Sequence, residues 1–233
     1  MARTPQTNEA FLREVDEELR RDQLARLWKS WGRLLIVVIA VGLVLFGGWL
    51  WWRDHQAKQA GAEGERLNAA IEQLSRNQVD PALPALKGLA ASDRPGYRAA
   101  AQLASASIAA QKGDIQTAVD TYAGVAKDEK VGQPFRDLAL IRQTTTQFDT
   151  LPPDQVIQRM RPLAQKGQPW FGSAGELLAV AQLKAGRSAE AGATFAALAA
   201  DPAVPSSIRS RSAQMASVLG LDMSAAPAPS LAR

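Results

Sequence analysis

The sequence predicts an all-α protein, in which one N-terminal transmembrane helix is followed by an α-solenoid of helical hairpins. Three observations predict this class. A single uncharged run of nineteen residues lies near the N-terminus, alanine makes up 39 of the 181 residues after it, and a pattern of small and aromatic residues in that region returns after 73 positions. Alanine is the strongest helix former, and no alternating strand-like run bounded by hairpin turns interrupts the region. Its length fits one medium domain or a short repeat array.

The segment before the uncharged run has the pattern of an amphipathic helix. Residues 8–33 place apolar side chains at helical spacing, with acidic residues early and basic residues late. The acidic cluster of Glu14, Asp16, Glu17 and Glu18 is more typical of a solvated face than of a binding site. The basic residues nearest the membrane are expected to meet anionic lipid headgroups, at about 1 kcal/mol each.

Residues 34–52 form the predicted membrane span. A helix of nineteen residues extends roughly 28 Å, close to the thickness of the bilayer core. Tryptophans stand near both ends, as expected at the two membrane interfaces. A buried core helix fits poorly, because such a helix is rarely apolar on every face. A cleaved signal peptide is the competing interpretation, but the 33 residues before the run and the lack of a prompt small-x-small site favour an uncleaved anchor.

The flanking charges predict the topology of this anchor. Five basic residues lie between positions 20 and 33, against three between positions 53 and 66. The positive-inside rule therefore puts the N-terminus in the cytoplasm. We expect a cytoplasmic amphipathic segment at 1–33, the transmembrane helix at 34–52, a helical repeat domain across the membrane at 53–220 and a disordered tail at 221–233. The span contains no charged residue of the kind that would indicate transport, so the helix is interpreted as an anchor.

Self-comparison of the region after the anchor indicates repeated helix pairs. Gly113-Asp114, Ala118, Tyr122 and Val125 align with Gly186-Arg187, Ala191, Phe195 and Leu198. The offset of 73 corresponds to two units of about 36 to 37 residues, close to the 34-residue period of tetratricopeptide repeats. A more degenerate unit lies between them and another lies upstream. We expect helix pairs at 62–92, 96–129, 134–167 and 170–200, and then a final helix from Ser206 or Ser207 to Leu219.

The repeated positions have structural roles in this interpretation, because a hairpin buries its apolar face only against its neighbours. Tyr122 and Phe195 should fill the space between hairpins, and stacking of a ligand on Tyr122 is the less favoured alternative. Gly113 and Gly186 should end the first helices in a left-handed conformation, and Asp114 should cap the next helix. Small residues are expected where helices pass closely: Ala106, Ala118, Ala179 and Ala191.

These positions carry a resemblance to tetratricopeptide repeats, which have a small residue in the first helix, often Gly-Asp at the turn, Ala followed by an aromatic residue four positions later, and Pro near the end. Pro202 fits the last position. With the N-terminal segment, the single anchor and the W-x-x-H-Q pattern from Trp52 to Gln56, the whole chain resembles the bacterial ancillary Sec-translocon subunit family. Its members are single-pass inner-membrane proteins with a periplasmic tetratricopeptide-like domain. The third unit departs from the pattern by lacking a clear Gly-Asp turn.

The resemblance implies a membrane-anchored interaction scaffold. Its implied partners are the Sec translocon and periplasmic chaperones, including a neighbouring anchored prolyl-isomerase-like chaperone, in addition to the lipid bilayer. In the predicted solenoid the first helix of each pair lines a concave surface. On this register the candidate partner-binding residues are Gln111, Arg136, Gln143, Glu176 and Lys184. An alternative function is a regulatory tether whose cytoplasmic segment binds a soluble regulator.

The composition argues against an enzyme. With no Cys and a single His, the chain has no disulfide, no thiolate nucleophile and no His-His metal pair, and the net charge of +4 gives little support to nucleic-acid binding. Residues 171–175 superficially match a nucleophile elbow, but the first glycine and the preceding strand are missing. His55 is interpreted as an interfacial residue. A hydrolase acting on the cell wall would need an acidic cleft, which the sequence does not display. We therefore predict no catalytic residue, cofactor or metal.

Overall fold

A computed structural model describes residues 6–221, with side chains from residue 32 onwards. Over these residues the chain is helical and contains no strand, so the predicted all-α class is confirmed. The chain divides into two compact units, Met1–Ala62 and Glu63–Arg233, which are described separately below. The predicted tail lies outside the described residues except for Leu221.

Helix α1 (Gln6–Ser75) contains the predicted membrane span. Every large apolar side chain between Leu34 and Trp52 is exposed, from 44% for Leu50 to 74% for Val44. A helix that exposes apolar side chains in every direction suits a lipid environment, because the backbone is satisfied internally and the surface matches the acyl chains. The structure thus supplies one helix that is long and apolar enough to cross a membrane.

Aromatic and polar side chains meet at the C-terminal end of this span. The Arg53 guanidinium lies 5.6 Å from the centre of the Trp49 ring, and the His55 ring stacks on Trp51 at a centroid distance of 5.6 Å. Lys58 Nζ lies 2.7 Å from Asp54 Oδ2 one helical turn away. The change from indole rings at positions 49–52 to an ion pair at positions 54 and 58 is the expected pattern of a membrane–water interface.

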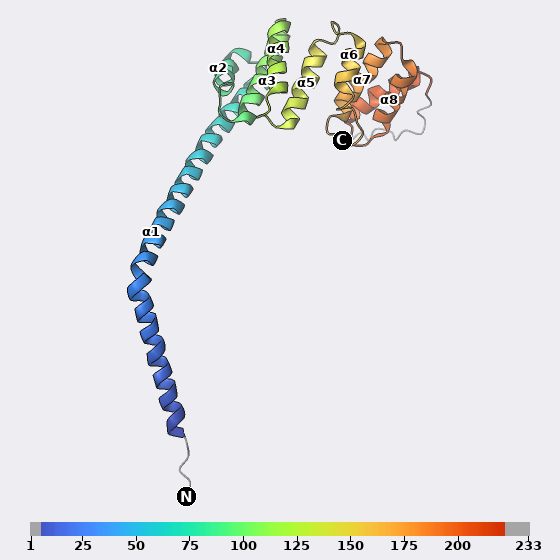
Figure 1. The fold of residues 1–233 in the computed structure, drawn as a ribbon. Coiled ribbons are helices and arrows are strands. Elements are labelled where there is room, and N and C mark those ends of the chain that lie inside the picture. The colour runs from blue at the N-terminus through green and yellow to red at the C-terminus, as the bar shows by residue number, and fades with distance from the viewer. Residues whose placement is uncertain (1–5, 222–233) are drawn as a thin grey trace. The chain divides into compact units, whose positions relative to one another are not determined.

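The second unit is built from the helical hairpins that the sequence predicts (Figure 1). The last turns of α1 pair with α2, α3 pairs with α4, α5 with α6 and α7 with α8, and α9 ends the array. The predicted order of helices is therefore confirmed. The bounds are α2 (Val79–Leu89), α3 (Pro95–Gln111), α4 (Ile115–Lys127), α5 (Gln133–Thr146), α6 (Pro153–Met160), α7 (Phe171–Lys184), α8 (Ser188–Ala200) and α9 (Ser206–Val218).

The first helices of the pairs form one continuous row. Helix α3 contacts α5, α5 contacts α7, and α7 contacts the terminal helix α9. Among the described helices no such direct contact joins α4 to α6 or α6 to α8. The odd-numbered helices consequently line one side of the array, which is the arrangement that a solenoid binding surface requires.

The repeated glycines end the first helices of two pairs in the predicted way. Gly113 has a φ of 83° and Gly186 a φ of 73°, which are left-handed values that favour glycine. The amide of the next residue then donates back across the turn, from Asp114 N to Ala109 O at 2.9 Å in the first case. Asp114 also accepts a hydrogen bond from Thr117 N at 3.2 Å, so the predicted cap of α4 is confirmed.

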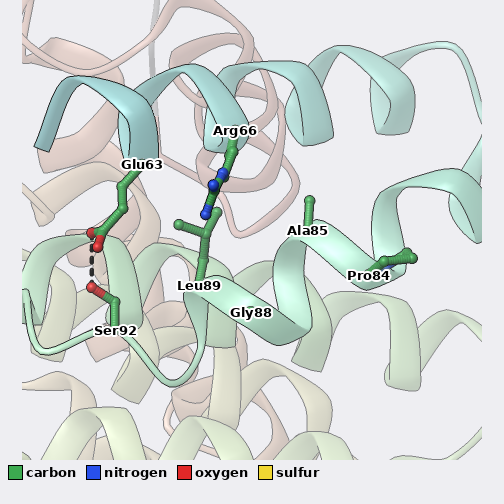
Figure 2. Close-up of a pocket in the computed structure, with 7 residues that line it drawn as sticks. All are labelled: Glu63, Arg66, Pro84, Ala85, Gly88, Leu89 and Ser92. Carbon is green, nitrogen blue, oxygen red and sulfur yellow. Dashed lines mark hydrogen bonds between the residues drawn. The ribbon is translucent and has the colours of Figure 1, made fainter. Parts of the chain in front are cut away.

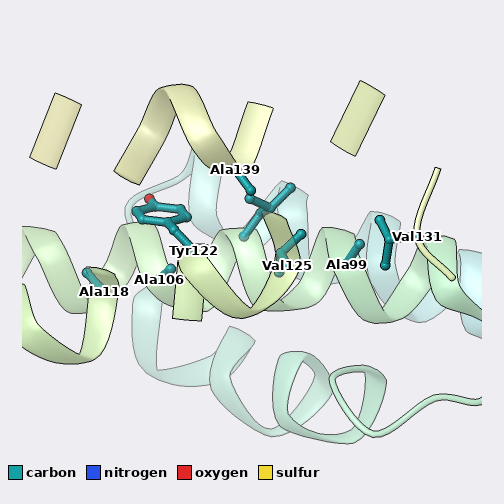
Figure 3. Packing of buried hydrophobic residues seen from close by; sticks show 8 residues of the cluster. Ala99, Ala106, Ala118, Tyr122, Val125, Val131 and Ala139 are labelled. Atoms are coloured by element: carbon teal, nitrogen blue, oxygen red, sulfur yellow. The ribbon is translucent and has the colours of Figure 1, made fainter. Parts of the chain in front are cut away.

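Buried small and aromatic residues hold neighbouring hairpins together, as Figure 3 shows for α3, α4 and α5. Tyr122 is 2% exposed, and its hydroxyl lies 2.9 Å from Ser107 Oγ. Phe195 is 1% exposed at the equivalent position of the later unit. The aromatic ring is therefore a core residue in both of these units, and the burial of Tyr122 contradicts the alternative of ligand stacking on it. The four predicted small positions are also buried: Ala106, Ala118, Ala179 and Ala191.

Helix α1 extends from Gln6 to Ser75, and residues 53–62 within it contain no proline and are mostly good helix formers. One boundary differs from prediction. Helix α6 ends at Met160, whereas the sequence predicted that the third pair would extend to residue 167. Pro162 disfavours further helix, and Gly167 adopts a φ of 86° in the loop that follows.

Candidate partner-binding groove

A groove lies on the side of the array formed by α5, α7 and α9, and its cavity has a volume of about 340 Å³. Helix α5 supplies one wall, and the other wall is formed by α7, the residue before it and α9. The lining residues are Leu138, Ile141, Arg142, Thr145, Trp170, Ser173, Glu176, Leu177, Ile208 and Arg211.

Helical spacing brings these side chains to the groove. On α5 the lining positions are 138, 141, 142 and 145, and on α7 they are 173, 176 and 177, which is the spacing of one helix face. Adjacent faces of both helices enter the core, where Ala139 and Ala174 are fully buried. The same packing that builds the array therefore directs one partly apolar face of each helix into the groove.

The charged residues of the groove are not equivalent. Glu176 accepts hydrogen bonds from Arg211 Nε and Nη2, each at 2.9 Å. This bidentate contact raises the pKa of the Arg211 guanidinium above its ordinary value, mainly through the hydrogen bond and then through the charge of Glu176. Arg142, on the α5 wall, is exposed and makes no ion pair or hydrogen bond to another side chain among the described residues. It is thus a cation with its guanidinium available to a partner.

Trp170 connects the groove to a second cavity of about 340 Å³. Trp170 and Ser173 line both cavities. The second is formed by the loop before α7 and the loop between α8 and α9, and it includes Pro169 and Pro205. This pair of cavities, called the trough, has the Trp170 side chain in the lining of both members.

The structure places the five predicted contact residues at different sites. Glu176 lines the groove, where it is paired with Arg211. Gln143 is half-buried on α5, next to Arg142 but outside the lining set. Gln111 is exposed at the end of α3. The remaining two positions, Arg136 and Lys184, are engaged within the array.

Arg136 lies in the first turn of α5 and donates a hydrogen bond to Gln133. Lys184, at the end of α7, lies 2.8 Å from Asp149 Oδ1 and 4.5 Å from the centre of the Phe148 ring. Both side chains therefore make contacts within the array rather than in the groove.

Arg142, Trp170 and Arg211 line the groove but are not among the five predicted residues. On α5 the predicted Gln143 is one position from the groove-lining Arg142, and one position rotates a side chain by about 100° around the helix. The apolar spacing of Leu138 and Ile141 identifies the face that lines the groove. Arg211 lies on the final helix, for which the sequence predicts no contact residue.

The described residues show no catalytic constellation, and they contain no group of three or more His, Cys, Asp or Glu that could hold a metal ion. The motif at residues 171–175 forms the start of α7, and its glycines allow close packing. A Cβ at Gly175 would lie 2.9 Å from Leu198 Cδ2, and one at Gly172 would lie 3.3 Å from Val204 Cγ1. Close packing against neighbouring side chains therefore explains both glycines, and a catalytic turn is not needed to explain them.

Comparison with known families agrees with this architecture. The family model of the tetratricopeptide repeat-like domain matches residues 26–208, which is most of the chain. The chain belongs to this family. The tetratricopeptide repeat-like match covers every hairpin from the end of α1 to α8 and includes the membrane span.

A curated relative extends the match. The chain is 23% identical over 134 residues to the ancillary SecYEG translocon subunit of Haemophilus influenzae (strain ATCC 51907 / DSM 11121 / KW20 / Rd). The aligned part covers 58% of this chain and 65% of that relative, slightly less than two thirds of its length. The resemblance predicted from the sequence is thereby confirmed. No solved structure matches the chain.

Proposed function

We propose that this protein is a membrane-anchored interaction subunit that works beside the Sec translocon. The single observation that carries the proposal is the groove of α5, α7 and α9, with apolar side chains, a junction tryptophan and an unpaired arginine in a repeat domain that follows a membrane span. A surface of this composition suits polypeptide binding, because the few residues that dominate the energy of protein interfaces are enriched in Trp, Tyr and Arg.

The relative named as an ancillary SecYEG translocon subunit supports the choice of the Sec translocon as partner. We further propose that the N-terminal segment is cytoplasmic and that the repeat domain lies in the periplasm. There it would link the translocon to periplasmic chaperones that receive secreted or outer-membrane clients. The excess of basic residues before the span supports this orientation. The inferred role is binding, with no catalytic step.

Affinity purification of the full chain from gently solubilised membranes tests the proposal. We expect the Sec channel subunits to copurify with the wild-type protein, and an anchored periplasmic chaperone to be present in the same fraction. Trp170→Ala should reduce the chaperone fraction, because it removes the aromatic side chain at the junction of the two cavities. Absence of channel subunits from the wild-type fraction would contradict the proposal.

A variant lacking residues 2–27 separates the scaffold function from that of a regulatory tether. If the scaffold proposal is right, the shortened protein still copurifies with the channel, because the span and the repeat domain are intact. If the cytoplasmic segment carries the function, the shortened protein loses its partners while the repeat domain stays folded. A reporter fused at the C-terminus gives the orientation independently.

A further inference from the structure

The two ends of the helical array expose different kinds of surface. On the last helix, α9, the exposed positions are serine, arginine or glutamine, except for Val218 at its C-terminal end. A polar outer face of this kind ends a solenoid in water. The first hairpin differs, because Pro84 and Gly88 are exposed and Ala85 is half-buried around a cavity of about 430 Å³ (Figure 2).

This cavity is a valley between two helices. Glu63 and Arg66, from the part of α1 within the second unit, form one side, and the second half of α2 forms the other (Figure 2). Gly88 gives the α2 wall no side chain, and a Cβ at this position would meet no atom within 4 Å. The side of α2 that faces the rest of the array is occupied by Ala82 and Leu86, both fully buried. No helix among the described residues covers the valley.

The charges at the valley leave one free cation. Glu63 accepts hydrogen bonds from Ser92 Oγ at 2.8 Å and from Arg94 Nη1 at 3.0 Å, so its carboxylate is already satisfied. Arg66 has no such partner among the described residues. In the described part of the second unit, only Arg66, Arg142 and Arg161 among the arginines make no side-chain hydrogen bond or ion pair, and each lines a cavity.

We propose that this valley is a second docking surface, which takes an amphipathic α-helix of a partner protein with a carboxylate opposite Arg66. A valley between two packed helices accepts a third helix by fitting ridges into grooves, and low walls at Ala85 and Gly88 let its backbone approach. The unpaired guanidinium above Leu89 selects an acidic residue on the incoming helix, because a carboxylate would receive charge-assisted hydrogen bonds there.

This surface goes beyond the proposed function, because the groove of α5, α7 and α9 shares none of its lining residues. A chain with both surfaces would hold two partners at once. Binding in the valley should therefore persist when substitutions disable the groove, and the two sites can be tested separately in one protein.

The test uses a photo-crosslinking residue in place of Ala85 in the full chain in intact membranes, with the adduct mapped to a peptide by mass spectrometry. We expect an adduct with one partner segment that has apolar residues at helical spacing and an Asp or Glu. Gly88→Leu should lower the adduct yield about tenfold or more, since the new side chain fills the valley; a tenfold loss corresponds to about 1.4 kcal/mol. The matched control is Gly124→Leu on α4, where a Cβ also meets nothing within 4 Å and no described cavity is lined by the residue.

Arg66→Glu reverses the charge at the valley while leaving the α2 wall unchanged. It should also lower the adduct yield, and changing the mapped acidic residue to Lys should restore it. A second crosslinker at Leu177 reports on the groove, and its adduct should be unaffected by Gly88→Leu and Arg66→Glu. Three results at the Ala85 crosslinker would overturn the proposal. The first is no adduct, and the second is an adduct that is insensitive to Gly88→Leu. The third is an adduct only with lipid, with a second copy of this chain or with residues 222–233. None of these outcomes alters the Leu177 result, so the two proposals fail separately.

Discussion

Glu176 on α7 and Arg211 on α9 are joined by two hydrogen bonds of 2.9 Å each, and the pair forms part of the wall of the groove. Glu176 is only 27% exposed, whereas Arg211 is 55% exposed. The carboxylate that the sequence suggested as a partner contact is therefore already engaged in fixing the last helix. A single charge reversal at Glu176 changes both the α7–α9 contact and the charge of the groove.

We expect Glu176→Lys to lower the melting temperature slightly and to weaken partner capture, because it places two cations side by side. The double variant Glu176→Lys with Arg211→Glu restores an ion pair of opposite direction. It should recover the melting temperature measured by circular dichroism. If the double variant melts as low as Glu176→Lys alone, the ion pair does not link α7 to α9 in solution.

Trp170 should be the most sensitive residue of the groove, because it lines both cavities of the trough. Removing a central aromatic side chain from an interface typically costs 2 kcal/mol or more, so Trp170→Ala should lower partner affinity by about 30-fold. The measurement is quantitative copurification. Val218→Ala is the control, since Val218 is 80% exposed and lines none of the described cavities, and it should have no effect. Equal losses for both variants would argue against a specific groove.

Asp128 should make the stability of the α3–α4 hairpin depend on pH. Arg98 Nη2 lies 2.9 Å from Asp128 Oδ2, and Lys130 N donates to Asp128 Oδ1 at 3.0 Å. The hydrogen bond from Arg98, followed by that from the Lys130 amide, lowers the pKa of Asp128 below its ordinary value. A carboxyl group whose pKa is lower in the folded state stabilises that state at pH values above its unfolded-state pKa of about 3.9. This contribution is lost as the pH falls through the folded-state pKa.

Accordingly, Asp128→Asn should lower the melting temperature at pH 7, and the difference from wild type should shrink as the pH falls below about 4. Asp80→Asn is the control, because the Asp80 side chain is 91% exposed and its closest cation, Lys112, is 4.0 Å away. If the melting temperatures of Asp128→Asn and wild type differ by the same amount at pH 7 and pH 3, the ion pair of Arg98 and Asp128 contributes nothing to folding.

The glycines of the array provide a test of the backbone geometry. Gly186→Ala should destabilise the array by about 1–2 kcal/mol, because an alanine would have to adopt the left-handed φ of 73°. Gly175→Ala should also destabilise it, by about 1–3 kcal/mol from overpacking against Leu198, partly offset by better helix propensity. Gly124→Ala, in open space on α4, should instead stabilise by up to about 1 kcal/mol. Chemical denaturation measures all three, and the same sign for all would contradict the packing described.

Much of the fold could be predicted because local chemistry determines it. The turn at Gly113-Asp114 needs a residue that tolerates positive φ and an acceptor that caps the next helix, and both are readable from residue type. The end of α6 was harder, because Leu163 continues the apolar spacing while Pro162 ends the helix. In that segment the apolar pattern and the backbone restriction predict different boundaries.

The groove was predictable only in outline. Sequence periodicity identifies which helices line the surface, but a one-position difference in the helical register of α5 exchanges Arg142 for Gln143. Ion pairs between helices add a second difficulty, because the partners Glu176 and Arg211 are 35 residues apart. Whether a charged residue is free to bind or already engaged depends on such contacts, and no local pattern reveals them.

Site-specific crosslinking can establish whether the groove of α5, α7 and α9 holds a polypeptide partner. A photo-crosslinking residue is placed at Leu177 in the groove or, as a control, at Lys127, the exposed last residue of α4, in the full chain in intact membranes. If a partner occupies the groove, we expect one mapped adduct from Leu177 that is lost with Trp170→Ala, and no adduct from Lys127. Equal adducts from both positions, or a Leu177 adduct unchanged by Trp170→Ala, would show that the groove holds no specific partner.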